Sequence, residues 1–280
     1  MLVPAHVLTQ KAAANNRAVA AFNIDNLESA LAVTEVMRER GTPVIVQTIP
    51  RTLNYGGISV YAAMLRELTA DCDVDYAMHL DHGSGLALAE KCIKSGYSSV
   101  MFDGSALPFD ENVIRTREVA DFAHGLGVSA EGELGTIGGK EESDAESEAS
   151  YTKADEAAGF VRQTGVDLLA IGVGTAHGVY RGTPKINVTR VREISRVTDA
   201  SLVLHGASGL SDAVLRDCIA AGISKINFAT ELRIAYTSGI KKGFELLPGE
   251  FDPKLYMRIA VDEIKKVLNE KIDICESLTR

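Results

Sequence analysis

The pentapeptide HLDHG, residues 79–83, places two imidazoles and one carboxylate within four positions. Imidazole nitrogens bind transition metals and transfer protons near neutral pH, and carboxylates can do both as well. Taken alone, the segment fits a metal site, an acid–base pair or a polar strand end. Which interpretation holds depends on the elements that position these side chains.

Short apolar segments alternate with longer amphipathic ones along the whole chain. The short segments are rich in Val, Ile, Leu and Phe and bounded by Gly, Asn, Asp or Pro, which is typical of parallel strands buried on both faces. We predict strands at residues 19–22, 43–47, 76–80, 99–102, 128–134, 168–173, 202–205 and 224–228, and helices at residues 26–40, 59–68, 86–95, 110–126, 154–164, 189–197 and 211–220.

This alternation predicts an α/β fold, a single (β/α)8 TIM barrel in which residues 1–280 form one domain. A doubly wound open sheet is the alternative fold. The first strand is not followed by a G-x-G-x-x-G motif, which disfavours a dinucleotide-binding fold of that kind.

Composition narrows the class of protein. The 280 residues are 46% hydrophobic and 24% charged, with a net charge of −9, which disfavours binding to nucleic acid or to anionic membranes. We find neither an apolar run of about 20 residues nor a secretory signal pattern. The four cysteines are scattered, which predicts reduced thiols in a cytoplasmic protein, and we expect Cys275 to be the one that reacts with solvent.

Three of the six histidines fall at the ends of predicted strands, where barrel enzymes carry their chemistry. His82, His177 and His205 follow the third, sixth and seventh strands. Three imidazoles with a nearby carboxylate and no cysteine are typical of a catalytic zinc site with open coordination positions. His79 lies deeper in its strand, where a supporting hydrogen bond is expected.

Two further loops favour an anionic substrate. The segments HGASG (205–209) and NFAT (227–230) follow the last two strands, the usual phosphate site of this fold. Zinc would withdraw electrons from a ketone and an adjacent hydroxyl while carboxylates move protons. The combination describes a metal-dependent aldolase.

An acidic segment, GGKEESDAESEAS (138–150), follows the fifth strand. It is poor in apolar residues, and a solvated surface loop is one interpretation of it. Its place at a strand end favours the other, a mobile active-site loop covering about residues 138–152.

The chain resembles the class II, zinc-dependent ketose-bisphosphate aldolases from end to end. The matching stretches are AFNIDNLES, HLDHG, AEGELGTIGG, GTAHGVYRGTPKI, LVLHGASG, KINFATEL, YMRIAVDEIKKV and KIDICES. The resemblance implies reversible cleavage of a ketose 1,6-bisphosphate to dihydroxyacetone phosphate and glyceraldehyde 3-phosphate. It also implies one zinc ion per subunit and leaves open a monovalent cation such as Na+ or K+.

The resemblance also assigns roles to individual residues. Asp81 would exchange a proton with the aldehyde oxygen, and mobile Glu141 would take the α proton of dihydroxyacetone phosphate. Glu133 would offer the metal an alternative position beside the ligands His82, His177 and His205, and Asn227 would lie near the enediolate. The implied substrate-binding residues are Asn23, Gly178, Gly206, Ala207, Ser208, Asn227, Phe228, Ala229, Thr230 and Arg258, the last on a second phosphate across a dimer interface.

The branch of the family is indicated by two segments. Fructose-bisphosphate enzymes commonly carry Asp where this chain has Ala229, so the tagatose-bisphosphate branch is the more similar, with fructose 1,6-bisphosphate as the alternative. In QTIPRTL, however, Ile49 and Arg51 replace a Ser and a Gly of many relatives. These two changes leave another ketose phosphate open.

Two other interpretations of the chain are possible, a class I aldolase and a barrel without activity. A class I aldolase would need a Schiff-base lysine, for which Lys225 is the candidate, and would leave the three histidines unexplained. A catalytically silent barrel would be expected to have lost its ligands and acids. A homodimer or homotetramer is expected, and a separate non-catalytic subunit is an open possibility.

Overall fold

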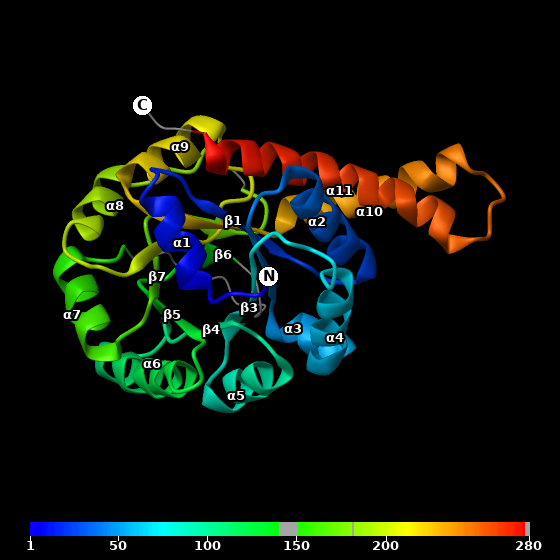
Figure 1. Cartoon of the computed structure of the whole chain (residues 1–280). Helices are drawn as coiled ribbons and strands as arrows, with labels where there is room; N and C mark the ends of the chain where they lie inside the picture. Colours follow the sequence, from blue (N-terminus) through cyan, green and yellow to red (C-terminus); the bar gives the residue numbers. More distant parts are fainter. Residues whose placement is uncertain (140–150, 181, 278–280) are drawn as a thin grey trace.

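The computed structural model describes residues 1–139, 151–180 and 182–277. Eight parallel strands close into a barrel in the order β1-β10-β9-β7-β5-β4-β3-β2. The prediction of a (β/α)8 barrel is confirmed (Figure 1). The barrel strands are β1 (Val19–Asn23), β2 (Val44–Thr48), β3 (Tyr76–Gly83), β4 (Ser99–Phe102), β5 (Ser129–Leu134), β7 (Leu168–Ile171), β9 (Ser201–Leu204) and β10 (Ile223–Phe228).

A ring of helices surrounds the barrel. Those predicted from the sequence are α2 (Leu27–Arg40), α4 (Ile58–Leu68), α5 (Leu86–Ser95), α6 (Phe109–His124), α7 (Ala154–Thr164), α8 (Val188–Ser195) and α9 (Asp212–Ala221). Side chains cap several of them: Asn26 and Ser29 form a capping box at the start of α2, and Ser211 caps α9.

Six elements were not predicted. They are the helices α1 (Ala5–Ala13), α3 (Pro50–Gly56), α10 (Thr230–Leu246) and α11 (Pro253–Glu276), and the two-residue strands β6 (Gly138–Gly139) and β8 (Ala176–His177). Two-residue strands carry no periodicity, and the seven-residue α3 is too short to show a helical pattern.

Inside the barrel, the side chains change from apolar to polar along five of the strands, β1, β2, β3, β4 and β9. Alternate residues point inward, and those near the start form a small apolar cluster with Ala5 and Leu8 of α1. Two residues further on, the same inward series turns polar. The pairs are Ala21 and Asn23, Ile45 and Gln47, Ala77 and His79, Met101 and Asp103, and Val203 and His205.

Helix α1 closes the N-terminal end of the barrel, lying across its opening in Figure 1. Its polar side chains bond buried hydroxyls at the strand starts: Thr9 Oγ1 donates to Ser201 Oγ at 2.8 Å, and His6 Nδ1 lies 2.8 Å from Ser129 Oγ. Because α1 closes the N-terminal end, called the lower end below, the open C-terminal end, the upper end, is where a ligand-binding site can form.

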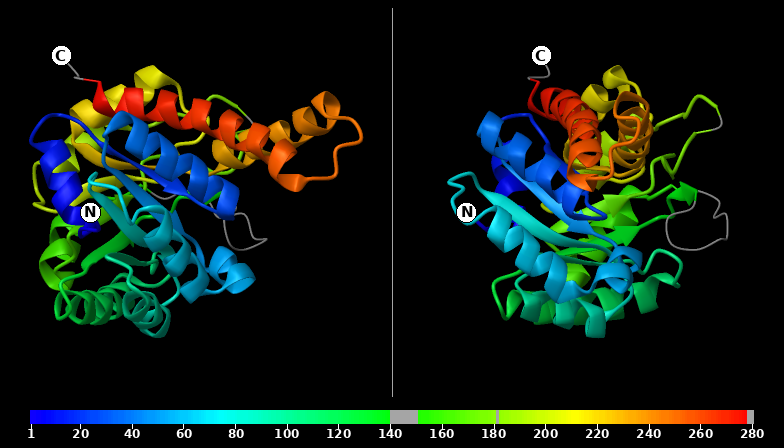
Figure 2. Two further views of the ribbon diagram at one scale, coloured as in Figure 1. Left: turned by 45° about the vertical axis from the view of Figure 1, so that its right-hand side comes forward. Right: turned by 90° about the vertical axis from the view of Figure 1, so that its right-hand side faces the viewer.

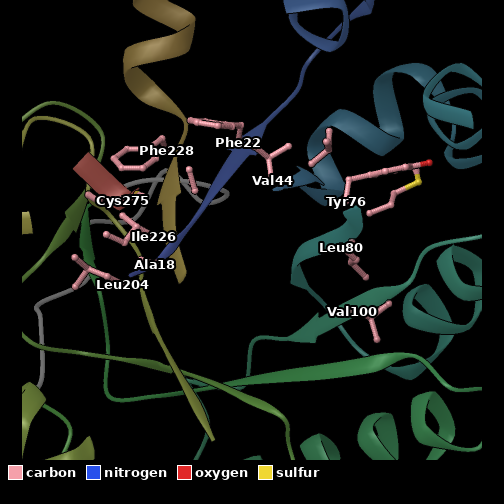
Figure 3. Packing of buried hydrophobic residues seen from close by; sticks show 14 of the residues in the cluster. Ala18, Phe22, Val44, Tyr76, Leu80, Val100, Leu204, Ile226, Phe228 and Cys275 are labelled. Atoms are coloured by element: carbon pink, nitrogen blue, oxygen red, sulfur yellow. The ribbon is translucent and has the colours of Figure 1, made fainter. Parts of the chain in front are cut away.

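Outward-facing residues of the strands form the larger core with the helices. Phe22 and Phe228 from neighbouring strands pack with ring centroids 5.8 Å apart (Figure 3). Cys275 belongs to this cluster and is 1% exposed, and burial raises the pKa of its thiol to about 12. The expectation that Cys275 reacts with solvent is therefore wrong, because α11 buries that side chain against the barrel.

Helices α10 and α11 pack along each other, and the turn that joins them extends beyond the ring of helices (Figures 1 and 2). Large apolar side chains are exposed near this turn, namely Phe244, Leu246, Phe251 and Leu255. Within residues 1–139, 151–180 and 182–277, none of the helices combines the length and apolarity that a bilayer crossing requires.

Candidate metal centre and active site

An irregularity in β3 brings two consecutive side chains to the mouth of the barrel. In a regular strand Asp81 and His82 would point to opposite faces. The register with β4 shifts between Leu80 and Gly83, and His82 adopts a left-handed φ of 49°. Such a conformation costs a non-glycine residue about 1–3 kcal/mol. The chain accepts this strain where it aims both side chains inward.

His82, His177 and His205 converge from β3, β8 and the end of β9. One ligand nitrogen of each lies within 4.8 Å of those of the other two. His205 Nδ1 and His82 Nε2 are 3.0 Å apart, and His205 is fully buried. The three strand-end histidines are thus brought together although they are far apart in the sequence.

Carboxylates set which nitrogens of two histidines carry protons. Asp103 Oδ2 lies 2.7 Å from His82 Nδ1, and Glu131 Oε1 lies 2.9 Å from His205 Nε2. Each carboxylate favours a proton on the nitrogen beside it, so the nitrogens that face each other both present lone pairs. Two facing lone pairs repel unless a cation lies between them. This donor set fits zinc, which prefers neutral imidazoles oriented by carboxylates.

Glu131 is also the centre of a buried ion pair. Its Oε2 lies 2.6 Å from Lys225 Nζ, and both side chains have zero exposure. Burial alone would raise the pKa of the Glu131 carboxyl, but Lys225, His79 and His205 outweigh burial and hold that pKa well below its usual range. An ammonium paired in this way is not a nucleophile, which disfavours the Schiff-base alternative for Lys225.

His79 has the supporting position expected of it. Its Nδ1 lies 2.7 Å from Ser99 Oγ, and its Nε2 lies 3.4 Å from Glu131 Oε2. Burial, followed by the charge of Lys225, lowers the pKa of His79 well below its usual range. The ring is therefore neutral and packs beneath the three histidines.

Glu133 lies near Nδ1 of His82, whereas His205 lies beside Nε2 of the same ring. Its Oε2 is 4.0 Å from His82 Nδ1, and His82, Asp103 and Glu133 form a second group able to hold a metal ion. Burial, and then the charge of Asp103, raises the pKa of the Glu133 carboxyl well above its usual range. The alternative metal position assigned to Glu133 stays a proposal with this geometry behind it.

Three amide groups hold the Asp81 carboxylate. Asn23 Nδ2 donates to Oδ2 at 2.8 Å, Gln47 Nε2 donates to Oδ2 at 3.1 Å, and Asn227 Nδ2 donates to Oδ1 at 3.2 Å. Asp81 itself is 1% exposed. Among the described residues, Gln47 Oε1 and Asn227 Oδ1 have no hydrogen-bond partner. These buried amide oxygens can accept hydrogen bonds from the hydroxyl groups of a ligand.

His177 is held by the short parallel pair of β6 and β8, in which Gly139 lies opposite His177. A Cβ on Gly139 would come within 2.2 Å of the His177 carbonyl oxygen, so only glycine fits. The proposed base Glu141 lies outside the described residues, as does most of the acidic segment.

The loops predicted to bind phosphate meet after β8, β9 and β10. Ala229 N–H donates to Ser208 Oγ at 3.3 Å, and Tyr180 OH donates to the Gly206 carbonyl at 2.7 Å. Gly206 has φ 63°, and a Cβ there would lie 2.7 Å from the Ala176 carbonyl oxygen. The contacts join three parts of the chain, which contain the predicted residues Gly178, then Gly206, Ala207 and Ser208, and then Asn227, Ala229 and Thr230 where β10 is followed by α10.

Two predicted substrate residues have other surroundings. The Phe228 side chain packs in the outer core, so any contact with a ligand would come from its backbone. Arg258, on α11, pairs with Glu35 of α2 through two nitrogens at 2.6 and 2.8 Å and with Asp262 at 3.2 Å. Among the described residues, Arg258 therefore pairs with acids of the outer helices α2 and α11, away from the three histidines.

Several residues around the site were missing from the predicted site. Gln47, Asp103 and Glu131 contact Asp81, His82 and His205, and Lys225, considered from the sequence only for a Schiff base, pairs with Glu131. All four belong to the inward series of their strands. Strand register could have identified Gln47 from the sequence. In the barrel Asn23 pairs with Gln47 and Gln47 pairs with His79, so Gln47 lies between two inward polar residues.

Comparisons with known proteins identify the family and the fold of the chain. The family model for class II fructose-bisphosphate aldolase matches residues 3–280. The chain is 32% identical to the YdjI aldolase from Escherichia coli K12, with a TM-score of 0.88 over 99% of this chain and 98% of that one. A fructose-bisphosphate aldolase from Campylobacter jejuni shares the fold at 20% identity, with a TM-score of 0.84 over 99% of this chain and 96% of that one. The chain therefore belongs to the class II fructose-bisphosphate aldolase family and is an aldolase, a carbon–carbon lyase.

Proposed function

We propose that the enzyme catalyses zinc-dependent, reversible cleavage of a ketose 1,6-bisphosphate to dihydroxyacetone phosphate and glyceraldehyde 3-phosphate. Tagatose 1,6-bisphosphate is the favoured substrate, with fructose 1,6-bisphosphate or another ketose phosphate as the alternative. The observation that carries the proposal is the pair of facing imidazole nitrogens of His82 and His205, 3.0 Å apart, beside the amide-held Asp81.

The chain's own residues would divide the work between binding and proton transfer. His82, His177 and His205 would hold zinc, which when bound supplies a Lewis acid that polarises the ketose carbonyl and stabilises negative charge. Asp81 would accept the proton of the C4 hydroxyl as the C3–C4 bond breaks and would return it to the aldehyde oxygen in condensation. The three amides that hold Asp81 fix the direction of this transfer.

The orphaned amide oxygens of Gln47 and Asn227 support a polyhydroxylated substrate, because each can accept a hydrogen bond from a sugar hydroxyl. Gly178, Gly206–Ser208 and Asn227–Thr230 would bind the dihydroxyacetone phosphate end. Glu141 is proposed as the base that takes the α proton. A monovalent cation near this loop cluster is a further proposal.

The preference for tagatose bisphosphate rests on Ala229. Ala229 is 8% exposed, and its backbone N–H donates to Ser208 Oγ. Its side chain is a methyl group at the position where fructose-bisphosphate enzymes commonly carry Asp. Removing a carboxylate changes the hydrogen bonds available to the sugar hydroxyls. This argument concerns the sugar and leaves the metal chemistry unchanged.

The test is cleavage of tagatose 1,6-bisphosphate and fructose 1,6-bisphosphate in parallel, with and without EDTA and added zinc. We expect faster cleavage of the tagatose isomer, loss of activity with EDTA and recovery with zinc. Equal or fructose-favoured turnover would overturn the substrate preference alone. Chelator-resistant cleavage would contradict the zinc proposal.

Self-association is proposed as well, as a homodimer or homotetramer. The support is the extended turn between α10 and α11, on which Phe244, Leu246, Phe251 and Leu255 are exposed. Phe251 is 92% exposed, and a cluster of this kind is typical of a protein–protein contact. Sedimentation analysis of Phe251→Asp against wild type checks it: an unchanged oligomer would remove this support.

A further inference from the structure

A cavity of about 400 Å³ lies beside the Asp81 network and outside the residues assigned above. Its walls come from the segment after β1, from the segment after β2 with helix α3, and from α10. The lining residues are Asp25, Ile49, Arg51, Thr52, Tyr55 and Arg233.

The cavity adjoins the residues that hold the proposed acid–base group. Asp25 follows Asn23 by two positions, and Ile49 follows Gln47 by two positions. Asn23 and Gln47 both donate to Asp81 Oδ2. Asp81 would act on the aldehyde oxygen. An aldehyde bound with its oxygen at Asp81 would therefore extend its remaining carbons toward this cavity.

Two of the three charged groups in the cavity neutralise each other. Asp25 accepts from Arg233 Nε at 2.8 Å and from Arg233 NH2 at 3.2 Å. Its Oδ1 also accepts from Thr52 Oγ1 at 2.9 Å. The Asp25 carboxylate is thus fully used, and it fixes Arg233 in the wall.

Arg51 supplies the remaining charge. It lies in the first turn of α3 and is exposed, and within residues 1–139, 151–180 and 182–277 its guanidinium makes no ion pair or hydrogen bond. Arg258, by contrast, has Glu35 and Asp262 as partners in its own chain. An unpartnered guanidinium beside a cavity presents a planar fork of donors that matches carboxylate or phosphate oxygens.

Residue 49 contributes no hydroxyl to the lining of the cavity, because this chain has Ile49 where many relatives carry Ser. Ile49 is 2% exposed and offers only an apolar side chain there. Of the two guanidinium groups in the lining, Arg233 is paired with Asp25, so an anion entering the cavity would meet Arg51 as the cation without a counter-charge among the described residues.

We infer that this cavity binds the far end of the aldehyde half of the substrate and that Arg51 binds an anionic terminal group on it. The inference rests on the proposed aldolase function and deepens it, because it names the class of aldehyde: one ending in a phosphate or a carboxylate. Arg51 is thus a specificity residue contributed by the same chain as Asp81.

The test is condensation of dihydroxyacetone phosphate with three aldehydes: glyceraldehyde 3-phosphate, succinic semialdehyde, which ends in a carboxylate, and uncharged glyceraldehyde. Four proteins are compared: wild type, Arg51→Gln, Arg51→Lys and the control Arg117→Gln. Arg117 is exposed on α6, where it pairs with Asp121 at 3.6 Å and with no other acid among the described residues, so the control removes one surface charge.

Arg51→Gln is expected to lower kcat/KM for the preferred anionic aldehyde by about 10- to 100-fold, the usual range for a lost hydrogen bond to a charged group. Its kcat/KM for glyceraldehyde should match wild type. Arg51→Lys should retain part of the preference, and Arg117→Gln should retain all of it. The aldehyde on which Arg51→Gln loses most identifies the terminal group as phosphate or carboxylate.

A second readout separates this inference from the proposed function. Exchange of the α proton of dihydroxyacetone phosphate with deuterium, followed by NMR, needs no aldehyde. Normal exchange together with equal losses on all three aldehydes, or with no loss on either anionic aldehyde, would overturn the role of Arg51 alone. Absence of exchange in zinc-loaded wild type would overturn the proposed function and the inference with it.

Discussion

At the N-terminal end of the barrel, Thr9 and Ser201 join two uncharged hydroxyls at 2.8 Å, whereas further toward the C-terminal end, where Glu131 contacts His205, Glu131 and Lys225 pair two buried charges at 2.6 Å. Both pairs are buried inside the same eight strands. The lower pair satisfies polar groups at low cost, because neither partner carries a charge. The attraction between Glu131 and Lys225 must offset the cost of removing two ions from water, and a buried ion pair of this kind seldom adds to stability.

The difference indicates what each end is for. Helix α1 could not close the lower end over charged groups, so that end carries Ala5, Leu8 and hydroxyl pairs. The upper end keeps a strained His82 and orphaned amide oxygens, features that cost stability and are retained at functional sites. Substitutions at the two ends should therefore separate stability from catalysis.

The largest effect is expected at His177. His177→Ala removes one of three converging imidazoles, and two ligands do not hold zinc at a catalytic site. We expect cleavage to fall to background and the zinc content of the purified protein to approach zero. Full activity with stoichiometric zinc would show that the three histidines are not the site.

Asp81→Asn should be the next largest. The amide keeps the shape of the carboxylate but cannot accept the hydroxyl proton, so kcat should fall by at least about 100-fold, the low end for a general acid–base group. Zinc content should stay at the wild-type level. A variant that retains most of its kcat would assign the proton transfer to another residue.

Glu131→Gln should weaken zinc binding by about 10- to 100-fold, because the carboxylate that orients His205 loses its charge. It also leaves Lys225 buried without a counter-charge, a loss of about 3–5 kcal/mol in the free energy of unfolding. In the matched double variant, Glu131→Gln with Lys225→Met, stability should recover while zinc affinity stays low. Recovery of both would mean that Glu131 acts only on stability.

The smallest effect is expected at the lower end. Thr9→Val leaves the Ser201 hydroxyl without its partner and should cost about 1–3 kcal/mol in urea unfolding. Zinc affinity and kcat should not change. Weakened zinc binding in this variant would show that the two ends are coupled.

The sequence was sufficient for the barrel because strand and helix periodicities are local properties. His82, His177 and His205 could be grouped because the barrel brings strand ends to one mouth. Helix α1 was missed because its role, closing the barrel, depends on contacts with strands far along the chain. Likewise, the pairing of Glu131 with both Lys225 and His205 depends on side-chain reach across the barrel interior.

Hydrophobic periodicity also could not predict the strained backbone at His82. A regular strand would send His82 to the outer face, and only the shifted register between Leu80 and Gly83 turns it inward. The position of His177 beside Gly139 depends on a strand pair of two residues each, too short for any repeat. Strand position was enough to group these histidines, but the orientation of their side chains depends on these local departures.

The most direct measurement is anomalous diffraction at the zinc edge from crystals of the zinc-loaded enzyme. The account predicts one dominant peak per chain, bonded to His82 Nε2, His205 Nδ1 and a nitrogen of His177. A dominant peak elsewhere, such as among Asp103, Glu133 and His82 Nδ1, or no peak in an enzyme that remains active, would contradict the three-histidine site.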